Sequence, residues 1–452
     1  MNSRLLRMRW TLASYIGGIL FFSFLSGNAN CADEYKGEHD QQQAILMGPM
    51  ERLPNISQSL IISYLPSCDK GLFREVSRKY RDIRDLTFFG PVYDPSMYIT
   101  PFSSEISGGT IGSNIFKLIS AAQRRIIIAS DKCTNEEFLD DLLALHLGAG
   151  KMPLEIRIVT GEDRQTQTLF SKAKYANLIH QLVKSNRNRS GKMHNKFIVI
   201  DDDVVITGSP NLTYAAYNYN VESFVAIHHK FVAKLYFRYY HYIISGKDKY
   251  DNTQDEYRRV GKMMHVFNSA PGNPIQVCLA PILDIKSFVV REFDSSQLID
   301  INMFLVSRAH SPDDDIIANL LRARQGGAAI TIKVDEEQYK KFKYIPKALA
   351  PLIDFGVTAY TVSKNSEKIK TRTKRITTIP QFHDKLALIR HKDGSAKVFI
   401  GSAGFTDNVQ DNLNLENMVL LRIPEIYEQF LIHFNAVNGA RLNVKKIGED
   451  LG

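Results

Sequence analysis

The chain has 452 residues, 44% of them hydrophobic, a composition typical of a globular protein with two or three domains. The net charge of +9 favours an anionic partner, either nucleic acid or an acidic membrane surface, although an ordinary solvated basic surface explains it equally well. The four cysteines have neither CxxC nor metal-ligand spacing, which argues against a disulfide framework and against a zinc site.

The N-terminus has the pattern of a Sec-type signal peptide over residues 1–32. Three arginines precede an apolar stretch, Trp10–Leu25, and small and polar residues follow as far as Ala32. This order of a positive, an apolar and a small-residue region predicts export, with cleavage after Ala29 or Ala32. The mature protein is then periplasmic or secreted. An uncleaved membrane anchor is the alternative, although the apolar stretch is short for one.

Residues 33–90 are predicted to contain a linker and a small helical hairpin. Apolar residues repeat at helical spacing on both sides of a break at Pro66–Asp69. The segment resembles an F-box through Leu53-Pro54, Leu65-Pro66 and Val76–Arg81. That resemblance implies docking of residues 53–83 onto a ubiquitin-ligase adaptor, which requires delivery of an exported protein into a host cell. The alternative is a helical extension that packs on the next domain.

Residues 91–250 alternate between helical and strand patterns. We predict a helix over Ile111–Arg124, a buried strand over Arg125–Ser130, a helix over Thr134–Leu147 and a strand over Leu154–Thr160. Thr134 and Glu137 have the spacing of a capping box at the start of the second helix. This alternation indicates one α/β lobe.

Residues 251–445 repeat the alternation after a polar connector at Gly246–Asn273. A strand is expected over Leu298–Val306, a helix from Ser311 to Arg324, and a strand over Ala329–Val334. The predicted fold class is therefore α/β, with two lobes of mixed sheets flanked by helices in one chain, preceded by the helical hairpin.

The stretch Lys192–Thr213 brings polar groups to one end of an apolar hairpin. His194 and Lys196 stand two residues apart on a β-branched run, so they share one face of a strand. The acidic triplet that starts at Asp201 predicts the turn, and Gly208–Asn211 a tight loop that returns beside His194.

The stretch Gln381–Thr406 repeats this layout. His383 and Lys385 stand two residues apart, a turn is predicted at Asp393–Ser395, and Gly401-Ser402 follows. After each Gly-Ser pair an acid opens another apolar strand, Glu222 in the first copy and Glu416 in the second.

Two such half-sites resemble the phospholipase D superfamily, with its paired H-x-K-x4-D motifs and following G-S-x-N. The first copy is complete. In the second, Arg390 stands where the family has Asp, and Gly404 stands where it has Asn. The resemblance covers roughly residues 100–440 and implies that both half-sites meet between the two lobes.

The resemblance implies a metal-independent phosphodiesterase that needs no cofactor. His194 attacks phosphorus to form a phosphohistidine, His383 protonates the leaving oxygen and then activates water, and Lys196 and Lys385 hold the phosphoryl oxygens. A carboxylate is expected behind at least one imidazole to fix its tautomer. The predicted catalytic residues are His194, Lys196, His383, Lys385, Asp201, Glu222 and Glu416, and the predicted substrate-binding residues are Ser209, Asn211 and Ser402.

Phospholipid is the expected substrate, with contact to a membrane surface, and the protein is expected to be a monomer. A nuclease is the alternative enzyme, favoured by two basic loops around Lys184–Lys192 and Lys364–Arg375 that lead into the histidines. An F-box-like adaptor with an inactive phospholipase D-like body is the alternative of another class. By strand alternation Arg390 lies away from the reacting groups and replaces a scaffold acid, whereas Gly404 removes an expected phosphate donor.

Overall fold

The computed structural model describes the two predicted lobes. The described residues are 98–104, 110–148, 152–183, 191–245, 250–364, 367–370, 375–378, 380–437 and 442–448. The predicted signal peptide and the F-box-like segment 53–83 lie outside these residues, as do residues 184–190 of the first basic loop and residues 365–366 and 371–374 of the second.

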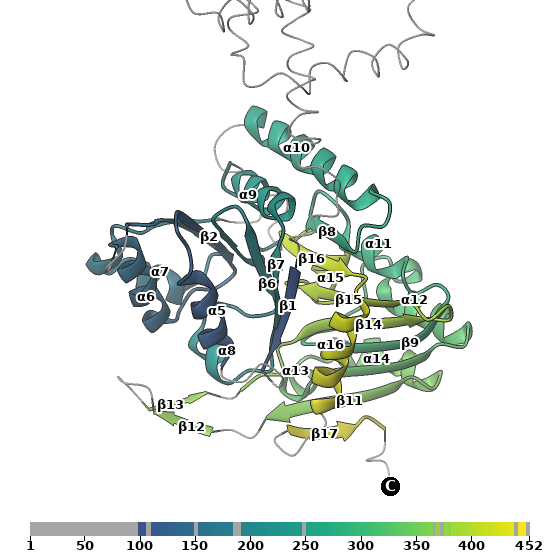
Figure 1. Ribbon diagram of the computed structural model, residues 1–452. Helices are drawn as coiled ribbons and strands as arrows, with labels where there is room; N and C mark the ends of the chain where they lie inside the picture. The colour runs from purple at the N-terminus through teal and green to yellow at the C-terminus, as the bar shows by residue number, and fades with distance from the viewer. Residues whose placement is uncertain are drawn as a thin grey trace, which may run out of the picture. The chain divides into compact units, whose positions relative to one another are not determined.

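The first lobe is built on a seven-stranded mixed sheet in the order β1-β7-β6-β5-β2-β3-β4 (Figure 1). β2, β3 and β4 pair in parallel, and the remaining pairs are antiparallel. The antiparallel hairpin β5–β6, with its turn at Asp201–Asp203, agrees with the prediction. The strands are β1 (Tyr98–Ser103), β2 (Arg125–Ser130), β3 (Glu155–Thr160), β4 (Ile179–Leu182), β5 (Lys196–Ile200), β6 (Val204–Gly208) and β7 (Ser223–His228).

The second lobe repeats this topology. Its eight strands follow the order β17-β11-β10-β9-β14-β15-β16-β8, so without β17 each strand has a counterpart at the same place in the first sheet. The strands are β8 (Ile275–Ala280), β9 (Ser296–Met303), β10 (Ala329–Asp335), β11 (Thr358–Lys364), β14 (Lys385–His391), β15 (Ala396–Gly401), β16 (Glu416–Leu421) and β17 (Leu442–Lys446). A separate two-stranded ribbon is formed by β12 (Glu367–Lys370) and β13 (Arg375–Thr378).

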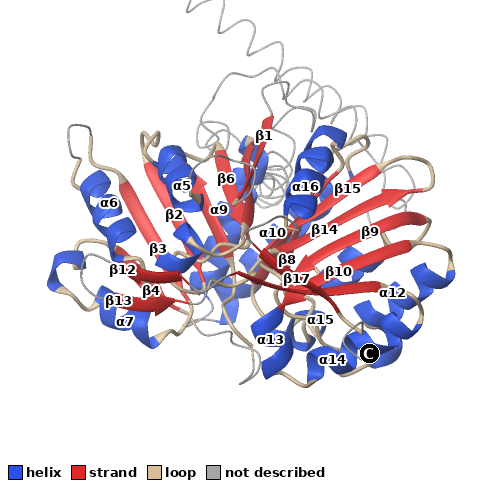
Figure 2. Ribbon diagram, turned by 90° about the horizontal axis from the view of Figure 1, so that it is seen from below, coloured by secondary structure: helices blue, strands red, loops and turns tan. Residues whose placement is uncertain are grey.

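Helices flank both sheets, which confirms the predicted α/β class (Figure 2). Among the described helices, none is both long enough and apolar enough to cross a membrane. The helices of the first lobe are α5 (Ile111–Ile119), α6 (Glu136–His146), α7 (Arg164–Phe170), α8 (Tyr214–Asn218), α9 (Lys230–Ser245) and α10 (Tyr250–Ser269). Those of the second are α11 (Ile285–Val290), α12 (Ile316–Gln325), α13 (Glu336–Lys341), α14 (Tyr344–Asp354), α15 (Asp407–Gln410) and α16 (Pro424–Ala436).

Local sequence explains why α5 forms and why it ends earlier than predicted. The Thr110 side chain caps its start by accepting from the backbone N–H of Ser113, and Ile111, Ile115 and Ile119 bury one face. The predicted extension to Arg124 is wrong because the backbone N–H groups after the helix bond elsewhere, as described below.

Two other sequence expectations need correction. The predicted capping box of α6 is absent, since Asn135 and not Thr134 occupies the N-cap position, with no side-chain capping bond. Both of these backbone N–H groups donate to the carbonyl of Leu212 instead. The polar connector 246–273 contains the 20-residue helix α10, whose buried face includes Val260 and Phe267. Its apolar residues Tyr257, Val260, Met263, Met264 and Phe267 recur at helical spacing, a signal that the polar composition of the segment masked.

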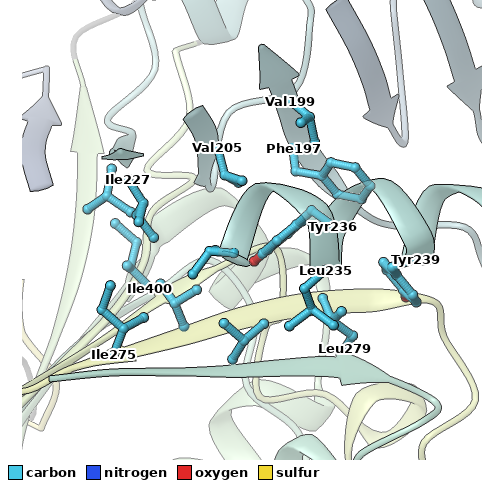
Figure 3. Close-up of a cluster of buried hydrophobic side chains, with 14 of the residues drawn as sticks. Phe197, Val199, Val205, Ile227, Leu235, Tyr236, Tyr239, Ile275, Leu279 and Ile400 are labelled. Carbon is cyan, nitrogen blue, oxygen red and sulfur yellow. The ribbon is translucent and has the colours of Figure 1, made fainter. Parts of the chain in front are cut away.

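A hydrophobic core joins the two lobes. It contains inward-facing residues of strands from both sheets together with the buried face of α9. Figure 3 shows Tyr236 and Leu235 of α9 beside Phe197 from the first sheet and Ile275 and Ile400 from the second. This shared core fixes the positions of the two hairpins relative to each other. It therefore also fixes the relative positions of the polar side chains at the ends of the hairpins.

Candidate active site

The two histidines lie just before the first strand of each hairpin and not within it. β5 begins at Lys196 and β14 at Lys385, two residues after each histidine. The backbone N–H of His194 donates to the carbonyl of Leu415 at 2.9 Å, and that of His383 donates to Val221 at 3.0 Å. Each histidine is therefore held by the backbone of the opposite lobe, and strand alternation does not set its direction.

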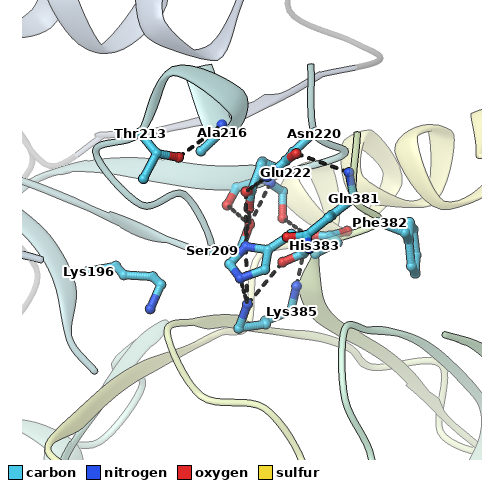
Figure 4. A network of polar contacts seen from close by, with 12 residues as sticks. Lys196, Ser209, Thr213, Ala216, Asn220, Glu222, Gln381, Phe382, His383 and Lys385 are labelled. Carbon is cyan, nitrogen blue, oxygen red and sulfur yellow. Dashed lines mark hydrogen bonds and ion pairs between the residues drawn. The ribbon is translucent and has the colours of Figure 1, made fainter. Parts of the chain in front are cut away.

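Each imidazole is paired with the glutamate of the other lobe. The Nδ1 atom of His194 lies 2.8 Å from Oε1 of Glu416, and Nδ1 of His383 lies 2.9 and 3.0 Å from the two carboxylate oxygens of Glu222 (Figure 4). Both glutamates are fully buried. Since a carboxylate accepts from N–H, both imidazoles carry a proton on Nδ1 and leave Nε2 available for chemistry.

The two serines support these glutamates. The hydroxyl of Ser209 donates to Oε2 of Glu222 at 2.5 Å, and that of Ser402 donates to Oε2 of Glu416 at 2.5 Å. Both serines are fully buried behind the imidazoles. This arrangement differs from their predicted role in phosphate binding, because each hydroxyl proton is already donated to a carboxylate.

Each glutamate also accepts a hydrogen bond from one asparagine, and the sequence interpretation missed both asparagines. The side-chain N–H groups of Asn220 and Asn414 donate to Glu222 and Glu416, each at 3.1 Å. Their amide oxygens accept from the backbone N–H of residues just before each histidine, 381 and 192. The repeated Asn-x-Glu spacing in both half-sites was a signal that could have identified them.

The two lysines lie next to the histidines. The Nζ atoms of Lys196 and Lys385 each donate to the backbone carbonyl of their histidine at 3.0 Å, and Lys385 Nζ is 3.2 Å from His383 Nε2. Both lysines are buried. Two lysine side chains and two imidazoles, one of each from either lobe, thus lie in one site.

Burial sets the protonation of the site. It lowers the pKa of His194 well below the usual range, helped by Lys196, and it lowers the pKa of His383 although Glu222 opposes this. Burial lowers the pKa of Lys385 to about 7 and raises that of Glu416 to about 7. Near neutral pH the imidazoles of the free protein are therefore neutral, as an attacking nitrogen must be.

The two half-sites differ in the residue that follows β2 in the first lobe and β9 in the second. Asp131 follows β2, and its Oδ2 lies 3.9 Å from Nε2 of His194. Phe304 follows β9 at the matching place, with its ring centre 4.7 Å from that of His383. No motif marks either residue, so sequence reasoning did not find them.

Asp201 lies at the end of β5 that is remote from His194, so its predicted place in the catalytic set is wrong. Its carboxylate accepts from the backbone N–H groups of Gln123, Arg124 and Arg125 at 2.7, 2.7 and 2.9 Å. It therefore ends α5 and anchors the start of β2. Arg390 lies at the matching end of β14 and pairs with Glu428 at 2.6 Å, away from His383.

Asn211 and Gly404 occupy matching loops. The amide oxygen of Asn211 is buried and has no hydrogen-bond donor among the described residues, so the structure does not place it in the network of the imidazoles. Gly404 has ordinary space for a side chain, since a Cβ atom added there would lie 3.5 Å from its nearest neighbour, the carbonyl oxygen of Leu305. In the described residues no group of three or more His, Cys, Asp or Glu side chains is arranged to hold a metal ion.

Comparisons with known proteins place this geometry among related folds. A family model described as "Cardiolipin synthase, PLD-like domain" matches residues 115–244 and 289–437, which together form more than half of the chain. No curated protein matches the chain in sequence.

Solved structures with a similar fold include phosphatidylserine synthase from Haemophilus influenzae Rd KW20. It has a TM-score of 0.52 and 12% identity, over 81% of this chain and 91% of that one. Polyphosphate kinase from Porphyromonas gingivalis has a TM-score of 0.46 and 11% identity, over 85% and 54%. The phospholipase D family member Nuc from Salmonella typhimurium has a TM-score of 0.28 and 22% identity, over 33% and 95%. At these identities the similarity to the synthase concerns the fold alone.

Proposed function

Because the chain belongs to the phospholipase D superfamily and is a phosphodiester-acting enzyme of that type, we propose that it hydrolyses phospholipid through a phosphohistidine intermediate. The observation that supports this most directly is the crossed pairing of each imidazole with the glutamate of the other lobe. The pairing holds two Nδ1-protonated imidazoles in one site and leaves Nε2 of each on the side away from its glutamate, where Lys385 contacts that of His383, as a two-step displacement requires.

In the first step, Nε2 of His194 attacks phosphorus and the bond to the leaving alkoxide breaks. His383 donates the proton from Nε2 to that oxygen, so a neutral alcohol leaves. The proton is present on His383 when substrate is bound, since an anionic phosphate and Glu222 both favour the imidazolium. Lys196 and Lys385 face the non-bridging oxygens and offset their negative charge.

In the second step, His383 is neutral and accepts a proton from water. The water oxygen forms a bond to phosphorus as the bond to His194 breaks, which releases the phosphate monoester and restores both imidazoles. His194 is assigned as the nucleophile because its half-site carries the complete motif and its pKa is lowered well below the usual range by burial.

Turnover of the purified chain in EDTA tests this proposal, with phosphatidylcholine and single-stranded DNA offered separately. Lipid turnover that is lost in both His194→Asn and His383→Asn, but kept in His265→Asn on the exposed side of α10, is the expected result. With a p-nitrophenyl phosphodiester, whose leaving group needs no proton, label at phosphorus should be trapped on the protein in His383→Asn and be absent from His194→Asn.

Other outcomes separate the alternatives. Turnover of DNA alone identifies a nuclease. If the folded protein turns over neither substrate, the proposed hydrolysis of phospholipid and its nuclease alternative are both refuted. The adaptor hypothesis for residues 53–83 is then tested by loss of partner binding in Leu65→Asp.

A further inference from the structure

Asp131 presents a carboxylate to the site without a donor of its own. Its side chain is 17% exposed, and Oδ2 lies 3.9 Å from Nε2 of His194, the nitrogen assigned to attack. Within the described residues no hydrogen-bond donor contacts this carboxylate, whereas Glu222 and Glu416 each accept from three side chains. The nearby charge of Lys196 offsets part of the cost of burying this carboxylate, but its oxygens still lack a hydrogen-bond donor, which a bound ligand would supply.

The fold does not require an acid at this place. The backbone N–H of Asp131 donates to the carbonyl of Asn195 at 3.0 Å, and that of Phe304 donates in the same way to Asp384 at 3.0 Å. The two positions are therefore equivalent in the two lobes, and one holds an aromatic ring. Only the first half-site has a carboxylate at this position. Its role therefore concerns the part of the substrate that binds on that side of the site.

Charge decides which part of a phosphodiester faces Asp131. The two non-bridging oxygens are anionic and are attracted to Lys196 and Lys385 and repelled by the carboxylate. The leaving oxygen lies opposite His194, in line with the attack. The alcohol that stays on phosphorus is the one remaining substituent, and it is uncharged at its ester oxygen.

We propose that Asp131 accepts a hydrogen bond from a hydroxyl group of the alcohol that stays on phosphorus. This rests on the proposed function and adds to it a preference for phosphodiesters with a hydroxyl next to the esterified carbon. A lysophospholipid carries such a group on its glycerol, and the ribose 2′-hydroxyl of RNA shares the same chemistry. Asp131 gives and takes no proton in the reaction, so the two displacement steps stay as written above.

The test compares substrates that differ by one hydroxyl. Lysophosphatidylcholine is paired with its analogue that lacks the glycerol hydroxyl, and a diribonucleotide with the 2′-deoxy dinucleotide. The intact chain should prefer a hydroxyl-bearing substrate by about 10- to 100-fold in kcat/KM, the range for a hydrogen bond to a buried charged group. The substrate pair that shows the preference tells whether a lipid or a nucleotide supplies the hydroxyl group.

Substitution of Asp131 then assigns the preference. In Asp131→Ala the kcat/KM ratio of the pair should fall to about one, and Asp131→Asn, which keeps an acceptor oxygen, should retain part of it. Asp141→Ala, an exposed acid of α6 in the same lobe, serves as the matched control with an unchanged ratio.

Each contrary outcome has a separate meaning. A ratio near one in the unmodified chain overturns the inference but leaves the proposed function intact. An equal loss on both members of a pair in Asp131→Ala also overturns it, because a purely structural or electrostatic role lowers both rates together. Failure of the unmodified chain to turn over any of the four phosphodiesters refutes the proposed function itself.

Discussion

Replacing Glu222 by Gln should impair the histidine of the opposite lobe. The carboxylate of Glu222 accepts from His383 Nδ1 at 2.9 and 3.0 Å, from Ser209 at 2.5 Å and from Asn220 at 3.1 Å. The amide is nearly the same size but neutral, so it keeps the packing and removes the negative charge that stabilises the imidazolium.

The size of the effect follows from the bond that is weakened. A hydrogen bond to a charged group contributes about 1.5–3 kcal/mol. Each 1.36 kcal/mol changes a rate tenfold. A step in which His383 gives or accepts a proton should therefore slow by about 10- to 150-fold.

A p-nitrophenyl phosphodiester separates the two steps, because p-nitrophenolate leaves without being protonated. Rapid mixing of enzyme and substrate should show a burst of about one equivalent of product in Glu222→Gln, followed by slow turnover, since only water activation needs His383. In Glu416→Gln the burst itself should slow, because that glutamate holds His194. Glu256→Gln on α10 is the matched control.

The reasoning is refuted if both variants keep the burst and the steady-state rate of the unmodified chain. An exchange of the two phenotypes would instead make His383 the nucleophile. The crossed pairing would stand in that case, and the assignment of the two steps would be reversed.

Three further results are expected. Asp201→Ala should lower the free energy of unfolding in urea by about 2–4 kcal/mol, because three backbone N–H groups lose their acceptor, with kcat unchanged; a kcat loss at full stability contradicts this. Gly401→Ala should destabilise the protein by at least about 2 kcal/mol, since its methyl group would lie 2.2 Å from a carbonyl oxygen of β16, whereas Gly404→Ala should change the free energy of unfolding by less than about 1 kcal/mol. The pH profile of kcat/KM should be a narrow bell near pH 7. Above it Lys385 loses the proton that holds phosphate, and below it Glu416 gains a proton and ceases to be a charged acceptor. A flat profile between pH 6 and 8 would contradict these two assignments.

Much of the fold could be predicted because its signals are local. The β-branched runs around Arg125–Ser130 and Lys196–Ile200 form the expected strands, and the Gly-Ser pairs close both hairpins. The errors fall where distant residues determine a local end. α5 stops before Arg124 because Asp201, 77 positions away in sequence, binds the backbone there.

The sequence by itself determined the list of reacting groups, since two H-x-K motifs, two Gly-Ser pairs and two following acids are countable along the chain. Only the tertiary structure decided their partners. It paired Glu222 with His383 and Glu416 with His194, turned the serines towards the glutamates, and set Asp131 against one imidazole and Phe304 against the other. The physical reason is that these contacts join segments as far apart as 222 positions, and the shared core between the two sheets, not any local pattern, brings such segments together.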